Sequence, residues 1–100
     1  MNEQAKLERA CVWAATGDTY AERAIGEYWF VKIKYERLHK MIIKREAGKL
    51  DFTPNCSMEQ WMAQAAAMGA YLYQLEIKAE IEGVDLDSFL FVATEGSAKA

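Results

Sequence analysis

The sequence predicts an all-α fold in which a short N-terminal helix is followed by a long antiparallel helical hairpin. Two stretches, residues 20–47 and 57–82, repeat apolar residues at helical spacing, and the single proline, Pro54, lies in the turn between them. The 100 residues carry a net charge of −3 and are 52% hydrophobic, which suits one small domain, residues 1–95, with a disordered tail at residues 96–100. Because so short and apolar a chain gains stability by assembling, we expect a helical oligomer.

The first helix is expected from about Glu3 to Ala15. Its apolar face is formed by Leu7, Ala10 or Cys11, and Ala14. Thr16-Gly17 ends it with the flexible residue that helix ends favour. We expect this helix to lie across one end of the hairpin or to dock on a neighbouring subunit.

The second helix begins with a capping signal. Asp18 or Thr19 supplies a cap oxygen, and Glu22 follows Thr19 by three residues in the capping-box pattern. Its apolar residues recur at spacings of four and three, so they share one face that is directed at a helical neighbour. They are Ala24, Tyr28, Val31, Tyr35, Leu38 and Ile42. The helix is expected to end near Ala47-Gly48.

The third helix starts after the turn at Gly48–Cys56. Ser57 with Gln60 repeats the capping pattern, and Gly83 is the expected stop. The apolar stripe of this helix consists of Met58, Trp61, Ala65, Met68, Leu72, Leu75 and Ala79. The remainder, Val84–Ala100, holds a small apolar patch, Leu86 and Phe89–Val92, which fits either a short helix or a strand.

Several classes of protein are disfavoured. Cys11 and Cys56 are too few for a secreted disulfide scaffold and lack the spacing of a zinc site. Acids stand near the N-terminus where a signal peptide is basic, and no apolar run approaches the roughly 20 residues that span a bilayer. We therefore expect a cytoplasmic protein with no membrane partner. No nucleophile motif or glycine-rich phosphate loop occurs, so we expect no enzyme, no catalytic residue and no cofactor.

The segment Glu36-Arg37-Leu38-His39 resembles half of a metal-binding motif. The Glu-x-x-His spacing places two ligands on one helix face, as in carboxylate-bridged di-metal centres. Such a centre also needs carboxylates from the facing helix, and the residues expected opposite, Gln64–Ala67, include no acid. We therefore assign no metal site and expect His39 at the surface or in an interface.

Positive charge is concentrated in the second helix. Residues 32–45 carry six of the twelve cationic side chains, Lys32, Lys34, Arg37, Lys40, Lys44 and Arg45, against one acid, Glu36. If the hairpin turns near Asp51-Phe52, this segment faces Met58–Tyr71, where Glu59 is the only carboxylate. The charge is thus available to an anionic ligand or another subunit. The alternative interpretation is a solvated helix face, which is what most charge runs are.

Aromatic residues beside this charge favour a nucleotide as the anion. An ammonium and a ring within one helical turn can hold a phosphate and a base together, because bases of any type stack on aromatic rings. The candidate ligand-binding residues are Tyr20, Trp29, Lys32, Lys34 and Arg37. We accordingly expect a nucleotide second messenger as the partner.

The layout of a short leading helix and a long hairpin resembles small all-helical bacteriophage proteins. Within that group it is similar to the anti-CBASS sponges, which sequester cyclic oligonucleotide signals of bacterial defence systems. The matching positions are Thr19-Tyr20, Val31-Lys32, Trp61, Ala65, Met68, Leu72 and Lys78-Ala79. The resemblance implies that Tyr20 stacks on a base and that Lys32 contacts a phosphate, with Lys34 in its place if the register shifts by two. It also implies a phage protein that holds its ligand without cleaving it.

Two other functions remain open at this stage. The chain fits a helical adaptor or inhibitor that grips an acidic host protein with its basic, aromatic face. Duplex nucleic acid is disfavoured as a partner, because duplex binders present a broad positive field and this chain is acidic overall.

Overall fold

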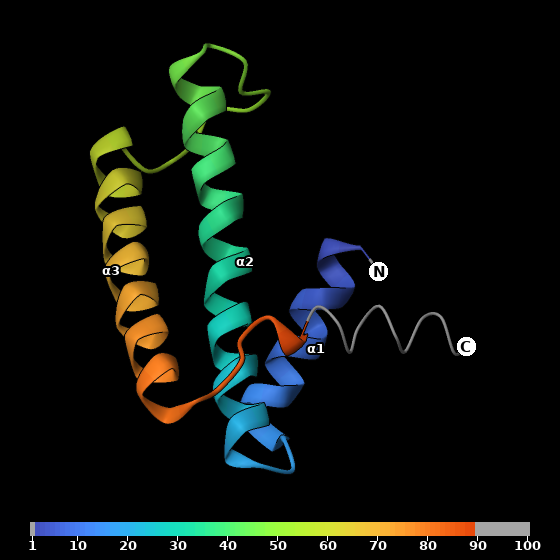
Figure 1. Ribbon diagram of the computed structural model, residues 1–100. Coiled ribbons are helices and arrows are strands. Elements are labelled where there is room, and N and C mark those ends of the chain that lie inside the picture. The colour runs from blue at the N-terminus through green and yellow to red at the C-terminus, as the bar shows by residue number, and fades with distance from the viewer. Residues whose placement is uncertain (1, 90–100) are drawn as a thin grey trace.

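The computed structural model describes residues 2–89, with helices α1 (Glu3–Thr16), α2 (Tyr20–Glu46) and α3 (Met58–Glu82) (Figure 1). No strand occurs among these residues, so the expected all-α class is confirmed. Helix α2 lies in the middle, α3 runs beside it in the opposite direction, and α1 packs on its other side (Figure 1). The expected tail, residues 96–100, and the apolar residues Leu90–Val92 lie outside the described residues.

Side-chain caps fix where the helices begin. The hydroxyl oxygen of Thr19 accepts a hydrogen bond from the backbone N–H of Glu22, and that of Ser57 accepts one from Gln60, so both predicted caps are confirmed. Asn2 caps α1 in the same way, which the sequence analysis did not predict. Each cap satisfies one of the N–H groups that the first turn of a helix leaves unpaired.

Two helices end at the predicted glycines, for different physical reasons. Gly83 follows α3 with φ 70°, a left-handed conformation that glycine adopts without strain. Gly17 follows α1 with φ −57°, which any residue can adopt. A Cβ atom on Gly17 would instead lie 2.8 Å from the carbonyl oxygen of Trp13, so glycine is required there by space.

The predicted stripe of α3 matches its packing, while α2 buries more than its predicted stripe. Every stripe residue of α3 is buried or partly buried. In α2, the stripe residues Tyr28 and Leu38 are buried, but Ile25, Gly26 and Ile33 outside the stripe are buried too. Helix α2 is therefore covered on two sides, by α3 and by α1.

At Gly26, α1 and α2 are in close contact. A Cβ atom at this position would lie 2.5 Å from both the backbone nitrogen of Ala14 and the Cβ of Trp13, and 2.8 Å from the carbonyl oxygen of Ala10. These are backbone and stem atoms, which cannot move aside without shifting the helix. The absence of a side chain at Gly26 therefore lets α1 rest directly on the surface of α2.

The segment after Gly83 crosses from the end of α3 to α1 (Figure 1). It places Phe89, which is fully buried, against Ala10 and Ile25. The ring of Phe89 meets Trp13 edge to face at 5.3 Å and stacks on Trp29 at 5.7 Å. The crossing segment thus completes the core between α1 and α2.

Three tyrosine hydroxyls join α2 to α3. The donor and acceptor pairs are Tyr28 to Glu76 at 2.6 Å, Tyr71 to Glu27 at 2.9 Å and Tyr20 to Glu82 at 2.9 Å. Burial, and then the bond to Glu76, raise the pKa of Tyr28 above its usual value, so its hydroxyl remains a donor. These bonds hold the first part of α2, residues 20–28, in register with the second half of α3, residues 71–82.

Candidate ligand-binding groove

Lys32 and Lys34 lie on opposite flanks of α2. Residues two apart in an α-helix point about 200° away from each other, so the two ammonium groups cannot serve one site. Lys32 is partly buried and Lys34 is exposed. Within residues 2–89 neither forms an ion pair with a carboxylate.

Lys34 stands at the edge of an apolar hollow between α2 and α3. The hollow has a volume of about 310 Å³ and is lined by Phe30, Val31, Lys34, Ala67, Met68 and Tyr71. The Nζ atom of Lys34 lies 5.2 Å from the centre of the Phe30 ring, a cation–π distance. The hollow therefore combines two aromatic walls with one exposed cation.

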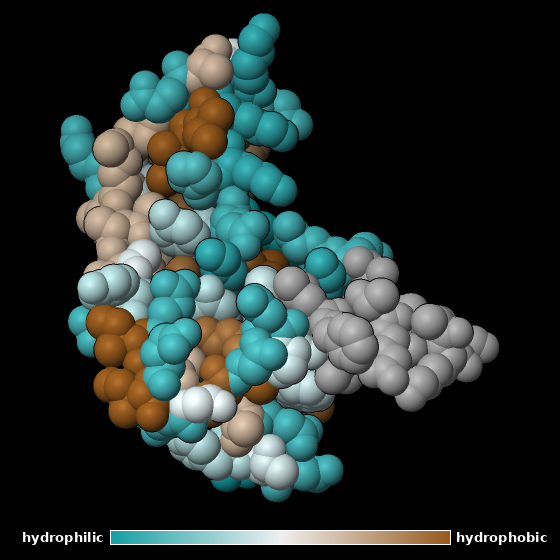
Figure 2. Space-filling view, in the orientation of Figure 1, coloured by the Kyte–Doolittle hydropathy of each residue, from teal (hydrophilic) through white to brown (hydrophobic). Residues whose placement is uncertain are grey.

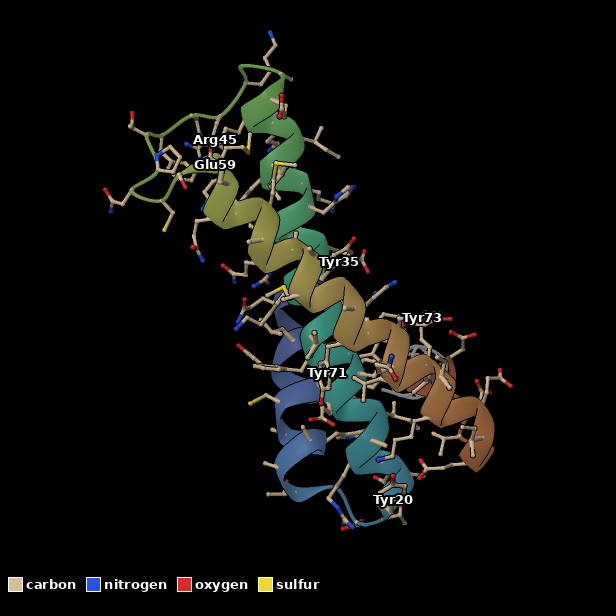
Figure 3. All side chains as sticks on the ribbon, turned by 90° about the vertical axis from the view of Figure 1, so that its left-hand side faces the viewer. Tyr20, Tyr35, Arg45, Glu59, Tyr71 and Tyr73 are labelled. Carbon is tan, nitrogen blue, oxygen red and sulfur yellow. The ribbon has the colours of Figure 1, made fainter. Side chains whose placement is uncertain are left out.

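Tyr71 closes one end of this hollow. Its hydroxyl donates to Glu27, and this bond, followed by burial, raises the pKa of Tyr71 above its usual value. Tyr71 is 43% exposed, so part of this residue is accessible to a ligand while its hydroxyl is held by Glu27. Figure 3 shows Tyr71 and Tyr73 on opposite sides of α3, with Tyr71 on the side of the hollow.

A second hollow lies nearer the start of α2, beside Glu27, which accepts the hydroxyl of Tyr71. It has a volume of about 240 Å³ and is lined by Ala14, Tyr20, Arg23, Ala24, Glu27 and Lys78. The Nζ atom of Lys78 lies 5.4 Å from the centre of the Tyr20 ring. The neighbouring Tyr20 hydroxyl, and then the charge of Glu82, raise the pKa of Lys78 above its usual value, so its ammonium keeps its charge.

We call the two hollows together the α2–α3 groove. Three cations, Lys34, Arg23 and Lys78, line it. Its carboxylate, Glu27, already accepts the hydroxyl of Tyr71. Each volume lies at or below the lower end of the roughly 300–1,000 Å³ typical of pockets for drug-sized ligands, so a ligand with several nucleotide units would have to occupy both hollows.

Trp29 lies in the core and not in the groove. Its indole N–H donates to the carbonyl oxygen of Leu86 at 2.8 Å, and its ring stacks on Phe89. A hollow of about 290 Å³ beside it is lined by residues of α1 and α2, among them the acids Glu3 and Glu36. The face that a base would need is thus taken by the segment that follows α3.

The side chain of Arg37 binds two residues of α1. Its Nε atom donates to Glu3 at 2.5 Å and its guanidinium also donates to Gln4 at 3.0 Å. Of the five sequence candidates, the structure therefore places Tyr20 and Lys34 in the α2–α3 groove, and Trp29, Lys32 and Arg37 elsewhere.

The Arg37–Glu3 contact predicts a small, acid-sensitive contribution to stability. The hydrogen bond from Arg37 lowers the pKa of Glu3, so this contribution is present above the unfolded pKa and lost as the pH falls through the lowered folded value. Both side chains are partly exposed, so we expect about 0.2–1 kcal/mol. The midpoint temperatures of thermal unfolding of the native chain and of Glu3→Gln should differ at neutral pH and coincide in acid. A difference that persists in acid would contradict an ionic origin.

The largest cavity described, about 490 Å³, has the wrong charge for a phosphate. It lies beside Tyr28 at the end of α3, and its acidic side chains are Glu76, Glu80, Asp85 and Asp87. Four carboxylates repel an anion. The α2–α3 groove is therefore the better candidate for an anionic ligand, in spite of its smaller volume.

Phe30, Arg23, Tyr71 and Lys78 are groove residues that the sequence candidates omitted. Phe30 and Lys34 are four residues apart, so they share one flank of α2, and this spacing was a usable signal. Tyr71 and Lys78 come from α3, where only a register between the helices could have assigned them.

Neither a metal site nor a membrane span is found among residues 2–89. No three His, Cys, Asp or Glu side chains in this part of the chain are arranged to hold a metal ion. His39 instead stacks on Tyr35 with ring centres 6.1 Å apart. None of the three helices combines the length and the apolar character that crossing a bilayer requires.

In this all-helical fold, one groove is lined by both aromatic rings and cations. A family model described as Sequestin matches residues 18–81, and the chain belongs to the Sequestin family. This is a family of cyclic nucleotide sponges, as the sequence resemblance indicated. The matched segment contains α2 and nearly all of α3, and hence both walls of the groove. Comparisons with curated proteins and with solved structures found no match.

Proposed function

We propose that this protein binds a cyclic nucleotide signal of a bacterial defence system in the α2–α3 groove and sequesters it. The observation that carries the proposal is the grouping of Phe30, Lys34 and Tyr71 around one apolar hollow within the segment matched by the family model. In the anti-CBASS role implied by the resemblance, the ligand is a cyclic oligonucleotide. The protein then acts in the cytoplasm of a phage-infected bacterium, as one helical domain within a homo-oligomer.

In this proposal the two hollows divide the ligand between them. A base lies against the open face of Tyr71 or of Phe30, where stacking contributes on the order of 1–3 kcal/mol per base. The phosphate next to that base is held by Lys34. Arg23 and Lys78 in the second hollow take a further phosphate, and Tyr20 offers a ring that is 48% exposed.

Sequestration without cleavage fits the chemistry of the groove. The Tyr71 hydroxyl donates to Glu27, which raises the pKa of Tyr71 and makes this hydroxyl a poor nucleophile. The cations of the groove are Lys and Arg side chains, which neutralise phosphate charge but do not by themselves activate water. The walls are helices that exist before the ligand arrives, so little ordering opposes binding.

Isothermal titration calorimetry with a panel of cyclic nucleotides tests the proposal. The panel contains cyclic mono-, di- and trinucleotides and cyclic ADP-ribose, which carries one base and a pyrophosphate. We expect saturable binding of one class, and mass spectrometry of the supernatant after heat denaturation should recover that ligand intact. Absence of heat across the panel, or recovery of a cleaved product, would contradict sequestration. Preference for cyclic ADP-ribose over the oligonucleotides would agree with sequestration but would contradict the anti-CBASS role.

Alanine substitutions of Lys34 and Lys32, which lie on opposite flanks of α2, test which flank binds the ligand. Lys34→Ala should weaken binding about 10- to 150-fold, because a hydrogen bond to a charged group contributes about 1.5–3 kcal/mol. Lys32→Ala, the matched control, should leave the dissociation constant unchanged. Calorimetry on both variants with the ligand identified by the panel gives the comparison. If the effects are reversed, the ligand occupies the opposite flank, as the original assignment of Lys32 implied.

A further inference from the structure

Among the described residues that line the α2–α3 groove, Glu27 is the acidic one. Arg23 and Lys78 line the same hollow as Glu27, and Lys34 lines the other. The four acids of the largest cavity lie instead beside the crossing segment. Figure 2 shows the face of the molecule that carries this segment, with hydrophilic side chains around it. Because a carboxylate repels a phosphate, the presence of Glu27 among the groove cations opposes anion binding unless the carboxylate has a use there.

The carboxylate of Glu27 has free acceptor positions. Its Oε1 atom accepts the hydroxyl of Tyr71 at 2.9 Å, and within residues 2–89 this is the one hydrogen bond found to the Glu27 side chain. A carboxylate offers about four acceptor positions in all. Glu27 is exposed, so the remaining positions are accessible to a donor on a ligand. Holding Tyr71 therefore uses only part of the capacity of this carboxylate.

Glu27 also links the two hollows of the groove. It lines the hollow of Arg23 and Lys78, and its carboxylate holds Tyr71, which lines the hollow of Lys34. On α2, Arg23 precedes Glu27 by four residues and Lys34 follows it by seven, so the three share one flank, about 6 Å and about 10 Å apart along the helix axis. The carboxylate thus lies between a ring that a base can contact and cations that a phosphate can contact.

The parts of a nucleotide follow the same order. The ribose connects the base to the phosphate, and its free hydroxyl groups are hydrogen-bond donors, which a carboxylate can accept. Carboxylates bind ribose hydroxyls in this way in dinucleotide-binding folds. Given the proposed function, on which this inference rests, we propose that Glu27 binds a ribose hydroxyl of the ligand and makes the groove selective for ribonucleotides over their 2′-deoxy counterparts.

The selectivity follows from what a deoxy ligand lacks. With a ribose in place, the charge-assisted hydrogen bond to Glu27 offsets the repulsion between its carboxylate and the nearby phosphates. With a 2′-deoxyribose the repulsion remains and the hydrogen bond is missing. Loss of a hydrogen bond to a charged group weakens binding by about 10-fold or more. We expect a difference of this size between the two sugars.

Isothermal titration calorimetry of the full chain with matched pairs of ligands tests the proposal. The ribonucleotides are cyclic AMP, cyclic di-AMP, cyclic di-GMP and cyclic tri-AMP, all with 3′–5′ links, and cyclic ADP-ribose. Each is paired with a counterpart that lacks the 2′-hydroxyl groups. We expect the deoxy member of the binding pair to have a dissociation constant about 10-fold higher or more. Equal affinities would overturn the selectivity and leave sequestration intact, whereas no binding of any ribonucleotide would overturn both proposals.

A Glu27→Gln variant separates sugar binding from the positioning of Tyr71. The amide oxygen of glutamine can still accept the Tyr71 hydroxyl, but the charge is lost. We expect weaker binding of the ribonucleotide and unchanged or tighter binding of the deoxynucleotide, because the repulsion of the phosphates is removed. Equal losses for both ligands would show that Glu27 only positions Tyr71, and would overturn the proposal. Glu36→Gln is the matched control, because Glu36 is an exposed acid of α2 that lines the hollow beside Trp29, and it should leave the affinity ratio unchanged.

A Tyr71→Phe variant tests the same point from the other side. It keeps the ring in the groove and removes the hydroxyl that Glu27 accepts. The carboxylate remains, so the ratio of ribonucleotide to deoxynucleotide affinity should persist even if both affinities fall. Loss of the ratio in Tyr71→Phe, with the ratio kept in Glu27→Gln, would assign sugar recognition to Tyr71 and overturn the proposal. Circular dichroism verifies that each variant is folded.

Discussion

A Phe89→Ala variant is expected to unfold with a free energy about 3–5 kcal/mol below that of the native chain, the usual cost of removing a buried aromatic ring. Phe89 is fully buried among residues of α1 and α2, and it contacts the rings of both Trp13 and Trp29. Its removal would leave a cavity that neighbouring helices cannot fill by a small shift. The loss is a large part of the roughly 5–15 kcal/mol that stabilises a typical domain.

Urea unfolding followed by circular dichroism and by tryptophan fluorescence measures the effect. Trp13 and Trp29 touch Phe89, so the fluorescence spectrum of the folded variant should shift as water reaches these rings. Phe52→Ala is the control, because Phe52 is 51% exposed in the turn before α3 and should change stability little. Equal midpoints for Phe89→Ala and the native chain would show that the crossing segment does not contribute to the core.

A Gly26→Ala variant should be destabilised by about 1–3 kcal/mol, although alanine is the better helix former. The added methyl group would meet Ala14 and Trp13 at 2.5 Å, and the contacting atoms belong to the backbone and stem of α1. Relief requires α1 to move away from α2, which would also disturb the contacts of Ile25 and Phe89.

Gly69→Ala provides a control of opposite sign. This glycine is also inside a helix, and a Cβ atom there would make an ordinary contact of 3.5 Å with the ring of Tyr35. Removing the flexibility of glycine should therefore stabilise the chain by about 0.5–1 kcal/mol. Thermal unfolding of both variants gives the comparison. If Gly26→Ala is stabilised as well, α1 is not packed as closely on α2 as the structure shows.

The local features of this fold could be predicted because their causes are local. Thr19 and Ser57 cap helices through bonds to residues only three positions away, and Gly83 supplies a conformation required at its own position. The stripe that contains Trp61 and Leu72 was visible because α3 uses only one face for the core of its own chain.

The second buried face of α2 was missed because a helix packed on two sides has no single clean stripe. Ile25, Gly26 and Ile33 interrupt the four-and-three pattern that Tyr28 and Leu38 follow. The burial of these residues depends on where α1 docks, which no periodicity within α2 specifies. The need for glycine at position 26 likewise depends on how α1 packs on α2, which the pattern within α2 does not specify.

For the candidate groove, the sequence indicated which cations and aromatic rings to consider, but not which face of the folded chain each one occupies. Lys34 and Tyr20 lie in the groove, while Arg37 is bound to Glu3 and Trp29 is packed on Phe89. Arg37 is held by α1, and Trp29 is covered by the segment that crosses from the end of α3 to α1. The surplus charge was real, but long-range packing decided which side chains remained available.

The crossing segment also has a consequence for biosynthesis. Ala10 and Ile25 emerge early from the ribosome, whereas Phe89 is translated after all three helices. The nascent chain must therefore keep the α1–α2 surface uncovered until that late residue is free, although the two helices contact each other through residues close in sequence. Premature termination within α3 would yield a polypeptide in which Trp13 and Trp29 lack the cover of Phe89, and such a product is a ready substrate for chaperones and proteases.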